Sequence, residues 1–189
     1  MQKILDDAVR EGRDLTSMGK TADYIPELGR VNKDYLGVCV FTKEGKRWQS
    51  GDSDVRFTIQ SISKVITLAV ALEKCGFEKV FARVGMEPSG DAFNSLIKLD
   101  LTSDHPFNPM INSGAIAVTN YLVSLVNFEE MLDFTKILCL DDKIVLDEKV
   151  YQSEMNHISR NKAIAYLLES KGILENSVEE TIDFYVKMC

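Results

Sequence analysis

Four serine–lysine pairs in this 189-residue chain have the Ser-x-x-Lys spacing, in which a lysine amine can activate a serine hydroxyl as a nucleophile. They are Ser17/Lys20, Ser61/Lys64, Ser95/Lys98 and Ser159/Lys162. Average composition gives roughly one such match by chance in a chain of this length. The spacing alone therefore identifies no nucleophile, and the surrounding sequence must choose among the four pairs.

The Ser61/Lys64 pair has the sequence context that this chemistry needs. An apolar run, residues 65–72, begins directly after Lys64, so we predict that a buried helix starts at Ser61. Free N–H groups at a helix N-terminus favour an oxyanion, and apolar surroundings lower the pKa of a lysine. The alternative is that Ser61 only caps the helix while Lys64 extends to water. The other three pairs fall in polar turns or loop starts, where we expect them to be solvated.

The elements that must position Ser61 form two groups along the chain. Residues 36–41 are an apolar run typical of a buried strand, and residues 46–50 return as a second strand after a turn. From Ser61 onward the apolar residues recur with a helical period. Helices are expected at residues 2–19, 61–74 (stopped by Gly76), 112–126, a segment capped by Asn127 and Glu130, 147–155, 160–170, and 177–188 with Asn176 as its cap. Residues 24–28 should form a loop.

Two strands are too few for a stable sheet, because a lone hairpin is marginally stable. Either another chain completes this sheet, or the polypeptide ends before its own sheet is finished. A continuous apolar strand such as residues 36–41 is typical of one buried on both faces and flanked on both sides. A free edge would present unpaired backbone groups to another chain. We therefore expect the chain on its own to self-associate.

Composition and charge exclude several classes of protein. Lys and Arg number 22 against 29 Asp and Glu, and a net charge of −7 disfavours a nucleic-acid partner and an anionic membrane surface. No apolar run approaches the ~18 to 20 residues of a membrane span, and residues 1–7 carry acids where a signal peptide has its apolar core. We expect a cytoplasmic protein.

The four cysteines stand singly, without metal-ligand spacing, which favours free buried thiols over a metal site.

A set of short segments carries the most specific pattern in the chain. They are Tyr24-Ile25-Pro26-Glu27-Leu28, Gln60-Ser61-Ile62-Ser63-Lys64, Glu87-Pro88-Ser89-Gly90, Phe93-Asn94, Asn108-Pro109-Met110-Ile111-Asn112-Ser113-Gly114-Ala115-Ile116, Gln152-Ser153-Glu154 and Arg160-Asn161-Lys162-Ala163-Ile164-Ala165-Tyr166. In order and nearly in spacing, this set closely resembles the serine-dependent glutaminase family. As a set, the segments are far more specific than a single Ser-x-x-Lys pair, and they select Ser61.

The resemblance implies an α/β fold of the α+β, β-lactamase-like kind, in which an antiparallel sheet adjoins a large helical subdomain. This chain would be a mostly helical, C-terminally truncated catalytic domain with an incomplete sheet. Its N-terminal helix and sheet would occupy about residues 1–60, and its helical part about 61–189. The family converts L-glutamine to L-glutamate and ammonia without a metal or organic cofactor. The resemblance also implies a homo-oligomer, a dimer or a tetramer.

When the family motifs are matched to this sequence, Ser61 corresponds to the nucleophile and Lys64 to the general base. Substrate-binding roles fall on Tyr24, Asn112, Glu154, Asn161 and Tyr185. Glutamine is a zwitterion, so its pocket needs an anion for the ammonium group and donors for the carboxylate. Glu154 suits the ammonium through a charge-assisted hydrogen bond, and amides and phenols suit the carboxylate.

Each of these residues also has an ordinary structural interpretation. Glu154 could be a solvated helix acid, the two asparagines could be helix caps, and the two tyrosines could be half-buried aromatic residues. Asn161 lies seven residues after Glu154, about two turns if one helix continues through both. In that case the two side chains would face the same way.

This sequence departs from the family pattern in its length. Family members continue beyond the position of Cys189 with further strands, a second catalytic tyrosine and an oxyanion-hole N–H, and losing one oxyanion donor typically costs about 10² to 10³-fold in rate. Three functions stay open: a glutaminase or its N-terminal part, a penicillin-recognising serine acyltransferase, and a catalytically incomplete fragment that binds a ligand or a partner chain. The second should have a Lys-Thr-Gly or Lys-Ser-Gly element, and this sequence contains neither.

Overall fold

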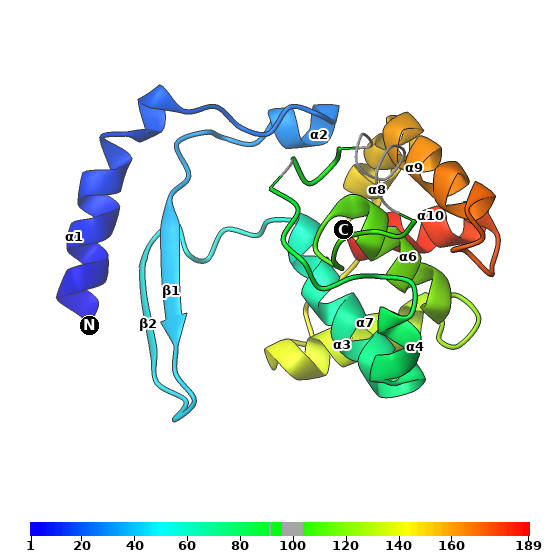
Figure 1. Cartoon of the computed structure of the whole chain (residues 1–189). Coiled ribbons are helices and arrows are strands. Elements are labelled where there is room, and N and C mark those ends of the chain that lie inside the picture. The colour runs from blue at the N-terminus through cyan, green and yellow to red at the C-terminus, as the bar shows by residue number, and fades with distance from the viewer. Residues whose placement is uncertain (91, 96–103) are drawn as a thin grey trace. The chain divides into compact units, whose positions relative to one another are not determined.

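The computed structural model describes residues 1–90, 92–95 and 104–189, and the chain divides into two units, Met1–Thr58 and Ile59–Cys189. The first unit contains a two-stranded antiparallel hairpin and a helix that packs on it (Figure 1). β1 (Gly37–Phe41) pairs with β2 (Arg47–Gly51), with Gly37 opposite Gly51 and Phe41 opposite Arg47. This confirms the predicted hairpin.

The helices of the first unit differ from the prediction in their extent. α1 (Gln2–Arg13) ends earlier than expected, and a 3₁₀ turn, η1 (Thr16–Met18), follows it. α1 contacts β2 and β1, and its buried residues are Leu5 and Val9. The expected loop around Pro26 contains a single helical turn, α2 (Pro26–Gly29), because proline is well tolerated as the first residue of a helix.

β1 is not the fully buried strand that its apolar run predicts. Exposed and half-buried residues alternate along it, with Gly37, Cys39 and Phe41 exposed. Successive side chains of a strand point to opposite faces, so this pattern means that one face of β1 is covered and the other faces solvent. In the part of the chain that the structure describes, β2 is the strand paired with β1.

The second unit is built around one central helix, α6 (Asn112–Leu122), all of whose residues are buried. A helix that is buried on every side must be surrounded by other elements, and α3, α9 and α10 pack against this one (Figure 1). The other elements of the unit are η2 (Gln60–Ile62), α3 (Ser63–Cys75), α4 (Phe77–Phe81), α7 (Phe128–Cys139), α8 (Glu148–Met155), α9 (Ser159–Ser170) and α10 (Val178–Met188).

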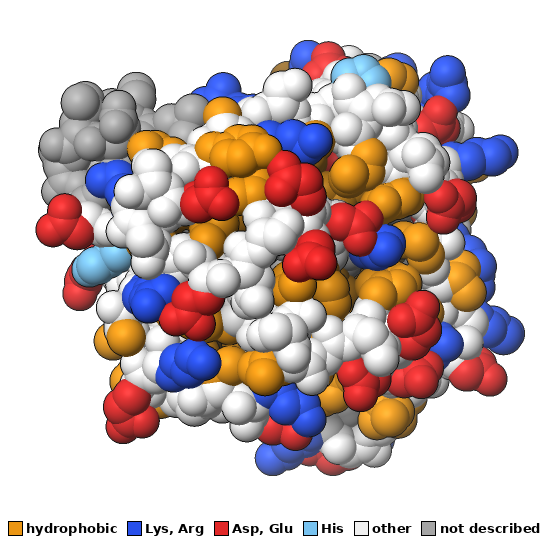
Figure 2. Space-filling model, turned by 90° about the vertical axis from the view of Figure 1, so that its right-hand side faces the viewer, with side chains coloured by type: hydrophobic (Ala, Val, Ile, Leu, Met, Phe, Trp, Pro, Cys, Tyr) orange, Lys and Arg blue, Asp and Glu red, His pale blue; other side chains and the backbone are white. Residues whose placement is uncertain are grey.

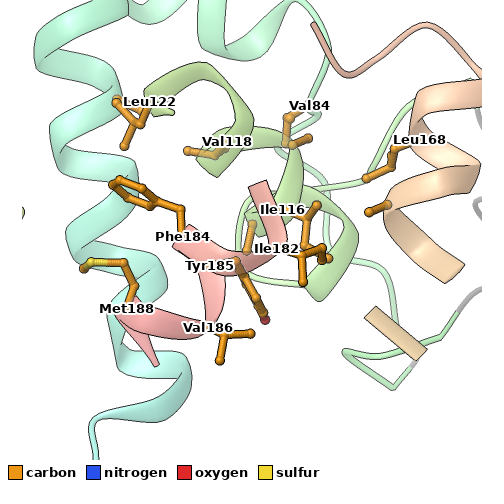
Figure 3. Close-up of a cluster of buried hydrophobic side chains, with 14 of the residues drawn as sticks. Val84, Ile116, Val118, Leu122, Leu168, Ile182, Phe184, Tyr185, Val186 and Met188 are labelled. Carbon is orange, nitrogen blue, oxygen red and sulfur yellow. The ribbon is translucent and has the colours of Figure 1, made fainter. Parts of the chain in front are cut away.

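The hydrophobic core of the second unit joins helices that are distant in sequence. Figure 3 shows part of it, with Ile116 and Val118 of α6, Leu168 of α9 and Ile182 and Phe184 of α10. These side chains are fully or almost fully buried. The core therefore fixes α6, α9 and α10 as a rigid support for polar groups at their ends.

Among the predicted signals for helix ends, a glycine stop and a capping box are confirmed and one predicted cap is wrong. α3 stops at Cys75, before Gly76, whose φ of +81° is in the region that favours glycine. Asn127 and Glu130 form the predicted capping box at the start of α7. Asn176 does not cap α10, because the hydroxyl of Ser177 accepts the Glu180 N–H in that role.

The surface is mixed in charge. Figure 2 shows a face on which Asp and Glu side chains are interspersed with Lys and Arg and with scattered hydrophobic side chains. Every helix within the described ranges is too short or too polar to cross a bilayer. The described residues also contain no cluster of three or more His, Cys, Asp or Glu side chains able to hold a metal ion. Cys39 and Cys139 are exposed, contrary to the expectation of buried thiols.

Candidate active site

Ser61 lies in η2, the 3₁₀ turn that leads into α3, and it is exposed. α3 begins at Ser63, two residues after the predicted helix start. The Ile62 N–H donates to the Ile59 carbonyl (2.9 Å), and the Ser63 N–H donates to the carbonyls of Gln60 and Ser61. The turn itself therefore uses backbone donors that were predicted to be free for an oxyanion.

Gln60, directly before Ser61, has a left-handed backbone conformation with φ of +45°. This conformation costs a residue with a side chain roughly 1 to 2 kcal/mol, so its surroundings must hold it. The Gln60 N–H donates to the carbonyl oxygen of Cys189 (2.9 Å), and the Gln60 side chain hydrogen-bonds to Glu154. Groups from the ends of α10 and α8 thereby fix the turn that carries Ser61.

Lys64 is buried, with 4% of its surface exposed, so the alternative in which it extends to water is wrong. Its Nζ donates to Asn112 Oδ1 (2.7 Å) and to the Met110 carbonyl (3.1 Å), and it lies 5.4 Å from the centroid of the Phe93 ring. Burial lowers the pKa of Lys64. A lysine with a lowered pKa is a better proton acceptor near neutral pH.

Asn112 and Asn161 extend the contacts of Lys64 across the unit. Asn112 is the first residue of α6 and is buried, and its Nδ2 donates to Oδ1 of Asn161 (3.0 Å) on α9. Its backbone N–H donates to the carbonyl of Phe93 (2.8 Å). Neither asparagine is the N-cap of its helix, since Ile111 and Ile158 occupy those positions. The side chains of Lys64, Asn112 and Asn161 instead form one hydrogen-bonded row.

A tight turn before α6 positions the Met110 carbonyl and leads into Asn112, the two groups that accept hydrogen bonds from Lys64. Asn108 Oδ1 accepts the Met110 N–H (2.9 Å) and the Ile111 N–H (3.2 Å), and Asn108 Nδ2 donates to the Glu87 carbonyl (2.8 Å). The turn approaches α6 at Gly114, where a Cβ atom would lie 1.9 Å from the Asn108 carbonyl oxygen. Glycine is therefore required at this position for the turn to lie against the helix.

Glu154 is buried as well, with 7% of its surface exposed, so it is not a solvated helix acid. It lies near the end of α8. Burial raises the pKa of its carboxyl group, and the hydrogen bond from Gln60 lowers that pKa by less. A buried carboxylate with few compensating donors is poised to pair with a cation that enters the site.

The thiol of Cys189 lies among the candidate residues. Its Sγ is 3.9 Å from Oγ of Ser63 and hydrogen-bonds to Tyr185, which is itself buried on α10. Burial, with the nearby charge of Glu154, raises the pKa of the thiol to about 12. The thiol is therefore protonated at neutral pH and packs as a neutral group.

The second unit thus contains six of the predicted site residues, and contacts link most of them. Lys64, Asn112 and Asn161 are joined directly, while Glu154 and Tyr185 meet around Cys189 and connect to the Ser61 turn through Gln60. Tyr24 belongs to the first unit, where it precedes α2 and is 58% exposed. Glu154 and Asn161 do not share one helix, because α8 ends at Met155 and α9 begins at Ser159.

Two other Ser-x-x-Lys pairs are described in full, and neither has a buried lysine. Ser17 and Lys20 are both exposed, and Lys20 forms an ion pair with Asp23 (2.8 Å). Ser159 is exposed and Lys162 is half-buried on α9. Lys98 lies outside the described residues. Of the pairs described in full, Ser61/Lys64 is the one whose lysine is buried.

Four residues of the site received no role from the sequence. They are Gln60, Phe93, Met110 and Cys189, and each contacts a candidate residue directly. Gln60, Phe93 and Met110 lie within the segments that carry the family resemblance, so membership in those segments was the available signal. Cys189 gave no signal of its own, since its neighbours in space come from other parts of the chain.

Comparison with known proteins identifies the family of this chain. The family model described as Glutaminase matches residues 19–189. The chain belongs to the glutaminase family. A curated relative, Glutaminase 2 of Clostridium perfringens, is 44% identical over the whole of this chain, which covers 63% of that relative. This glutaminase-family chain thus spans less than two thirds of the length of the curated relatives it matches.

Solved structures of similar proteins have the same fold. A probable glutaminase of Bacillus subtilis superimposes with a TM-score of 0.86 at 37% identity, covering all of this chain and 58% of that one. Mglu in its glutamate form superimposes with a TM-score of 0.89 at 38% identity, covering all of this chain and 44% of Mglu. The predicted α+β, β-lactamase-like fold is confirmed, with a mostly helical chain and a small antiparallel sheet.

Proposed function

We propose that this glutaminase-family chain carries the nucleophile, the base and most of the substrate pocket of an enzyme that hydrolyses L-glutamine to L-glutamate and ammonia. The observation that carries the proposal is the buried Lys64, whose pKa is lowered by burial and whose Nζ is held by Asn112 and Met110 three residues after Ser61. The solved glutamate form of Mglu, a related protein, supports a pocket for this amino acid.

In the first chemical step, the hydroxyl oxygen of Ser61 attacks the carbonyl carbon of the glutamine side-chain amide. Neutral Lys64 accepts the hydroxyl proton as the O–C bond forms. The same proton then passes from Lys64 to the amide nitrogen, the C–N bond breaks, and ammonia leaves. The product of this step is a glutamyl ester on Ser61.

In the second step, water hydrolyses the ester. Lys64 takes a proton from the attacking water, the bond between the Ser61 oxygen and the acyl carbon breaks, and the proton returns to Ser61. L-Glutamate is released. No metal or organic cofactor is needed at any point, since the serine and the lysine supply both the nucleophile and the proton transfers.

The remaining candidates orient the substrate in this proposal. Glu154 receives the α-ammonium group, because a buried carboxylate gains most from a charged partner. Asn112, Asn161 and Tyr185 face the α-carboxylate and the amide, and the substrate-binding role of Tyr24 stays a prediction. Amide groups can donate to a carboxylate and accept from an amide, which suits glutamine at both ends.

The proposal is tested by ammonia release from L-glutamine, measured on the 189-residue chain and on a chain of the full length of its relatives. Release by the full-length chain with incorporation of the glutamyl group on Ser61 supports the mechanism. The second candidate function is a fragment that binds the amino acid without catalysing hydrolysis by itself. It stays a candidate because this chain covers 63% of the length of its curated relative. Binding of L-glutamate without ammonia release by the 189-residue chain would assign that function.

The assembly and location expected from the sequence belong to the same proposal. A homo-oligomer, dimer or tetramer, is proposed for the enzyme, and sedimentation velocity at several concentrations measures its state. The cytoplasmic location stays a prediction.

Glu154→Gln should weaken the binding of L-glutamate by about 1.5 to 3 kcal/mol, the range for hydrogen bonds to charged groups. Glutamine at this position keeps the size of the side chain and loses the charge that pairs with the ammonium group. Calorimetric titration measures the change. An unaltered affinity would remove Glu154 from the pocket.

The same variant has a stability signature of definite sign. Burial raises the pKa of Glu154 in the folded chain, so its contribution to stability is present below the unfolded pKa and is lost as the pH rises through the folded pKa. Glu154→Gln abolishes this loss. At neutral pH the variant should therefore be at least as stable as the wild type in urea unfolding, which separates a binding role from a structural one.

A further inference from the structure

Helix α8 is held in place in an unusual way. It has eight residues, and all eight are described, yet the residue that it buries is the acid Glu154 rather than an apolar side chain. Tyr151 and Met155 pack against the core while remaining only partly buried. A helix of two turns is marginal by itself, so its contacts with neighbours determine where it sits.

One polar contact connects α8 to α10. The Tyr151 hydroxyl donates to Oδ1 of Asp183 (2.5 Å), and Lys187 Nζ forms an ion pair with the other oxygen of the same carboxylate (2.7 Å). Lys187 Nζ also lies 5.9 Å from the centroid of the Tyr151 ring. The hydrogen bond to Asp183 is the largest cause that raises the pKa of Tyr151, to about 12, so the phenol stays a donor.

This contact lies within two turns of candidate pocket residues on both helices. Tyr151 and Glu154 are three residues apart on α8, a spacing that places them on one face. On α10, Asp183 is followed by Tyr185 and then by Cys189, whose thiol lies near the charge of Glu154. A shift of α8 relative to α10 would therefore move Glu154 away from Cys189 and from the Gln60 side chain.

We propose that the Tyr151–Asp183 hydrogen bond, supported by Lys187, is a positioning contact that keeps the Glu154 carboxylate buried in the substrate pocket. Tyr151 and Asp183 do not touch the substrate and act through Glu154. The inference rests on the proposed function for the claim that Glu154 binds the ammonium group. The claim that Tyr151 holds Glu154 in its buried place does not depend on that function.

The chain offers a matched control for this contact. Tyr166 on α9 donates through its hydroxyl to Glu179 on α10, so it is also a tyrosine–carboxylate bond to α10. Tyr166 is 46% exposed, and its helix does not carry Glu154. Tyr166→Phe removes a bond of the same chemistry and leaves the setting of Glu154 unchanged.

The first measurement follows the titration of the Glu154 carboxyl group by NMR in the 189-residue chain, with Glu154→Gln used to assign the signal. In Tyr151→Phe, which keeps the ring and loses the hydroxyl, Glu154 should become more hydrated and titrate at lower pH than in the wild type. Tyr166→Phe should titrate like the wild type. The groups that face Glu154 are the Gln60 amide and the Cys189 thiol, and neither changes charge in the acid range used.

The second measurement is affinity for L-glutamate, expected to fall about ten-fold in Tyr151→Phe, as for a weakened charge-assisted hydrogen bond. In a chain that turns over, KM should rise with kcat nearly unchanged, because ammonium binding is the same in the ground and transition states. Asp183→Asn keeps an acceptor for the phenol and should retain most of the affinity, whereas Asp183→Ala should lose as much as Tyr151→Phe.

The outcomes separate this inference from the proposed function. If Glu154 titrates identically in the wild type and in folded Tyr151→Phe, the positioning role is overturned, whatever the affinity. If the wild type binds neither L-glutamate nor L-glutamine, the proposed function fails and the titration still decides the role of Tyr151. Should Tyr151→Phe not fold, the difference between Asp183→Asn and Asp183→Ala decides it, and equal titration in those two would overturn the inference.

Discussion

Ser61→Ala should abolish ammonia release from L-glutamine, lowering kcat by about four to six orders of magnitude in a chain length that turns over. Alanine has no oxygen to form the glutamyl ester, and no other hydroxyl stands three residues before a buried lysine in the described part of the chain. Since Ser61 is exposed, the substitution should change the unfolding free energy by no more than about 0.5 kcal/mol. Ser17→Ala, Ser95→Ala and Ser159→Ala are the matched controls and should keep full activity.

The pH dependence provides a second check of the same assignment. Burial lowers the pKa of Lys64, and the base acts in its neutral form. The value of kcat/KM should therefore rise with pH through the pKa of Lys64, with its midpoint below the ordinary range of a lysine. Lys64→Arg, which stays charged, should be inactive at every pH. Turnover by Ser61→Ala equal to that of the wild type would assign the nucleophile elsewhere.

Gly114→Ala should destabilise the chain by about 3 kcal/mol and remove any turnover that it has. The added Cβ would lie 1.9 Å from the Asn108 carbonyl oxygen and 2.7 Å from its carbon, and both are backbone atoms that cannot rotate away. The turn at residues 108–110 must then separate from α6. That movement withdraws the Met110 carbonyl and shifts Asn112, the two acceptors that hold Lys64.

Urea unfolding at fixed pH and ammonia release measure the two effects of Gly114→Ala. Gly12→Ala in α1 is the control, because its added Cβ would meet only the end of the flexible Leu36 side chain, at 3.0 Å. In Gly12→Ala the more favourable helix propensity of alanine offsets the cost of this close contact. The free energy of unfolding should therefore change by no more than about 1 kcal/mol. A Gly114→Ala chain as stable as the wild type would show that the turn is not held as tightly as its geometry indicates.

Local features of the fold could be predicted from the sequence because their causes are local. The capping box of Asn127 and Glu130 and the helix end at Gly76 follow from side-chain chemistry and backbone preference within a few residues. The hairpin was predicted from an apolar run and a polar run that lie on either side of a turn, and the structure confirms it. The exact start of α3 could not be predicted, since η2 owes its shape to a hydrogen bond between Gln60 and Cys189, residues far apart in the sequence.

Most site residues were predicted through the family resemblance. An apolar run beside Lys64 indicated that its side chain could be buried, whereas no pattern in the sequence indicated the burial of Glu154. Lys64 and Glu154 are of residue types that are usually exposed, and each is buried only because elements distant in sequence surround it. The continuous helix that would align Glu154 with Asn161 is interrupted between Met155 and Ser159. The arrangement around Lys64 depends instead on the close approach at Gly114, which periodicity does not reveal.

The cysteines give this chain two natural attachment points for dyes. Cys39 in β1 of the first unit and Cys139 at the end of α7 in the second unit are exposed, whereas the pKa of about 12 keeps the Cys189 thiol protonated. Maleimides react with thiolates, so labelling near neutral pH spares the pocket. With Cys75→Ser to remove the half-buried thiol, a donor and an acceptor dye would sit one on each unit. Energy transfer between them would then report directly on whether L-glutamine changes the separation of the two units.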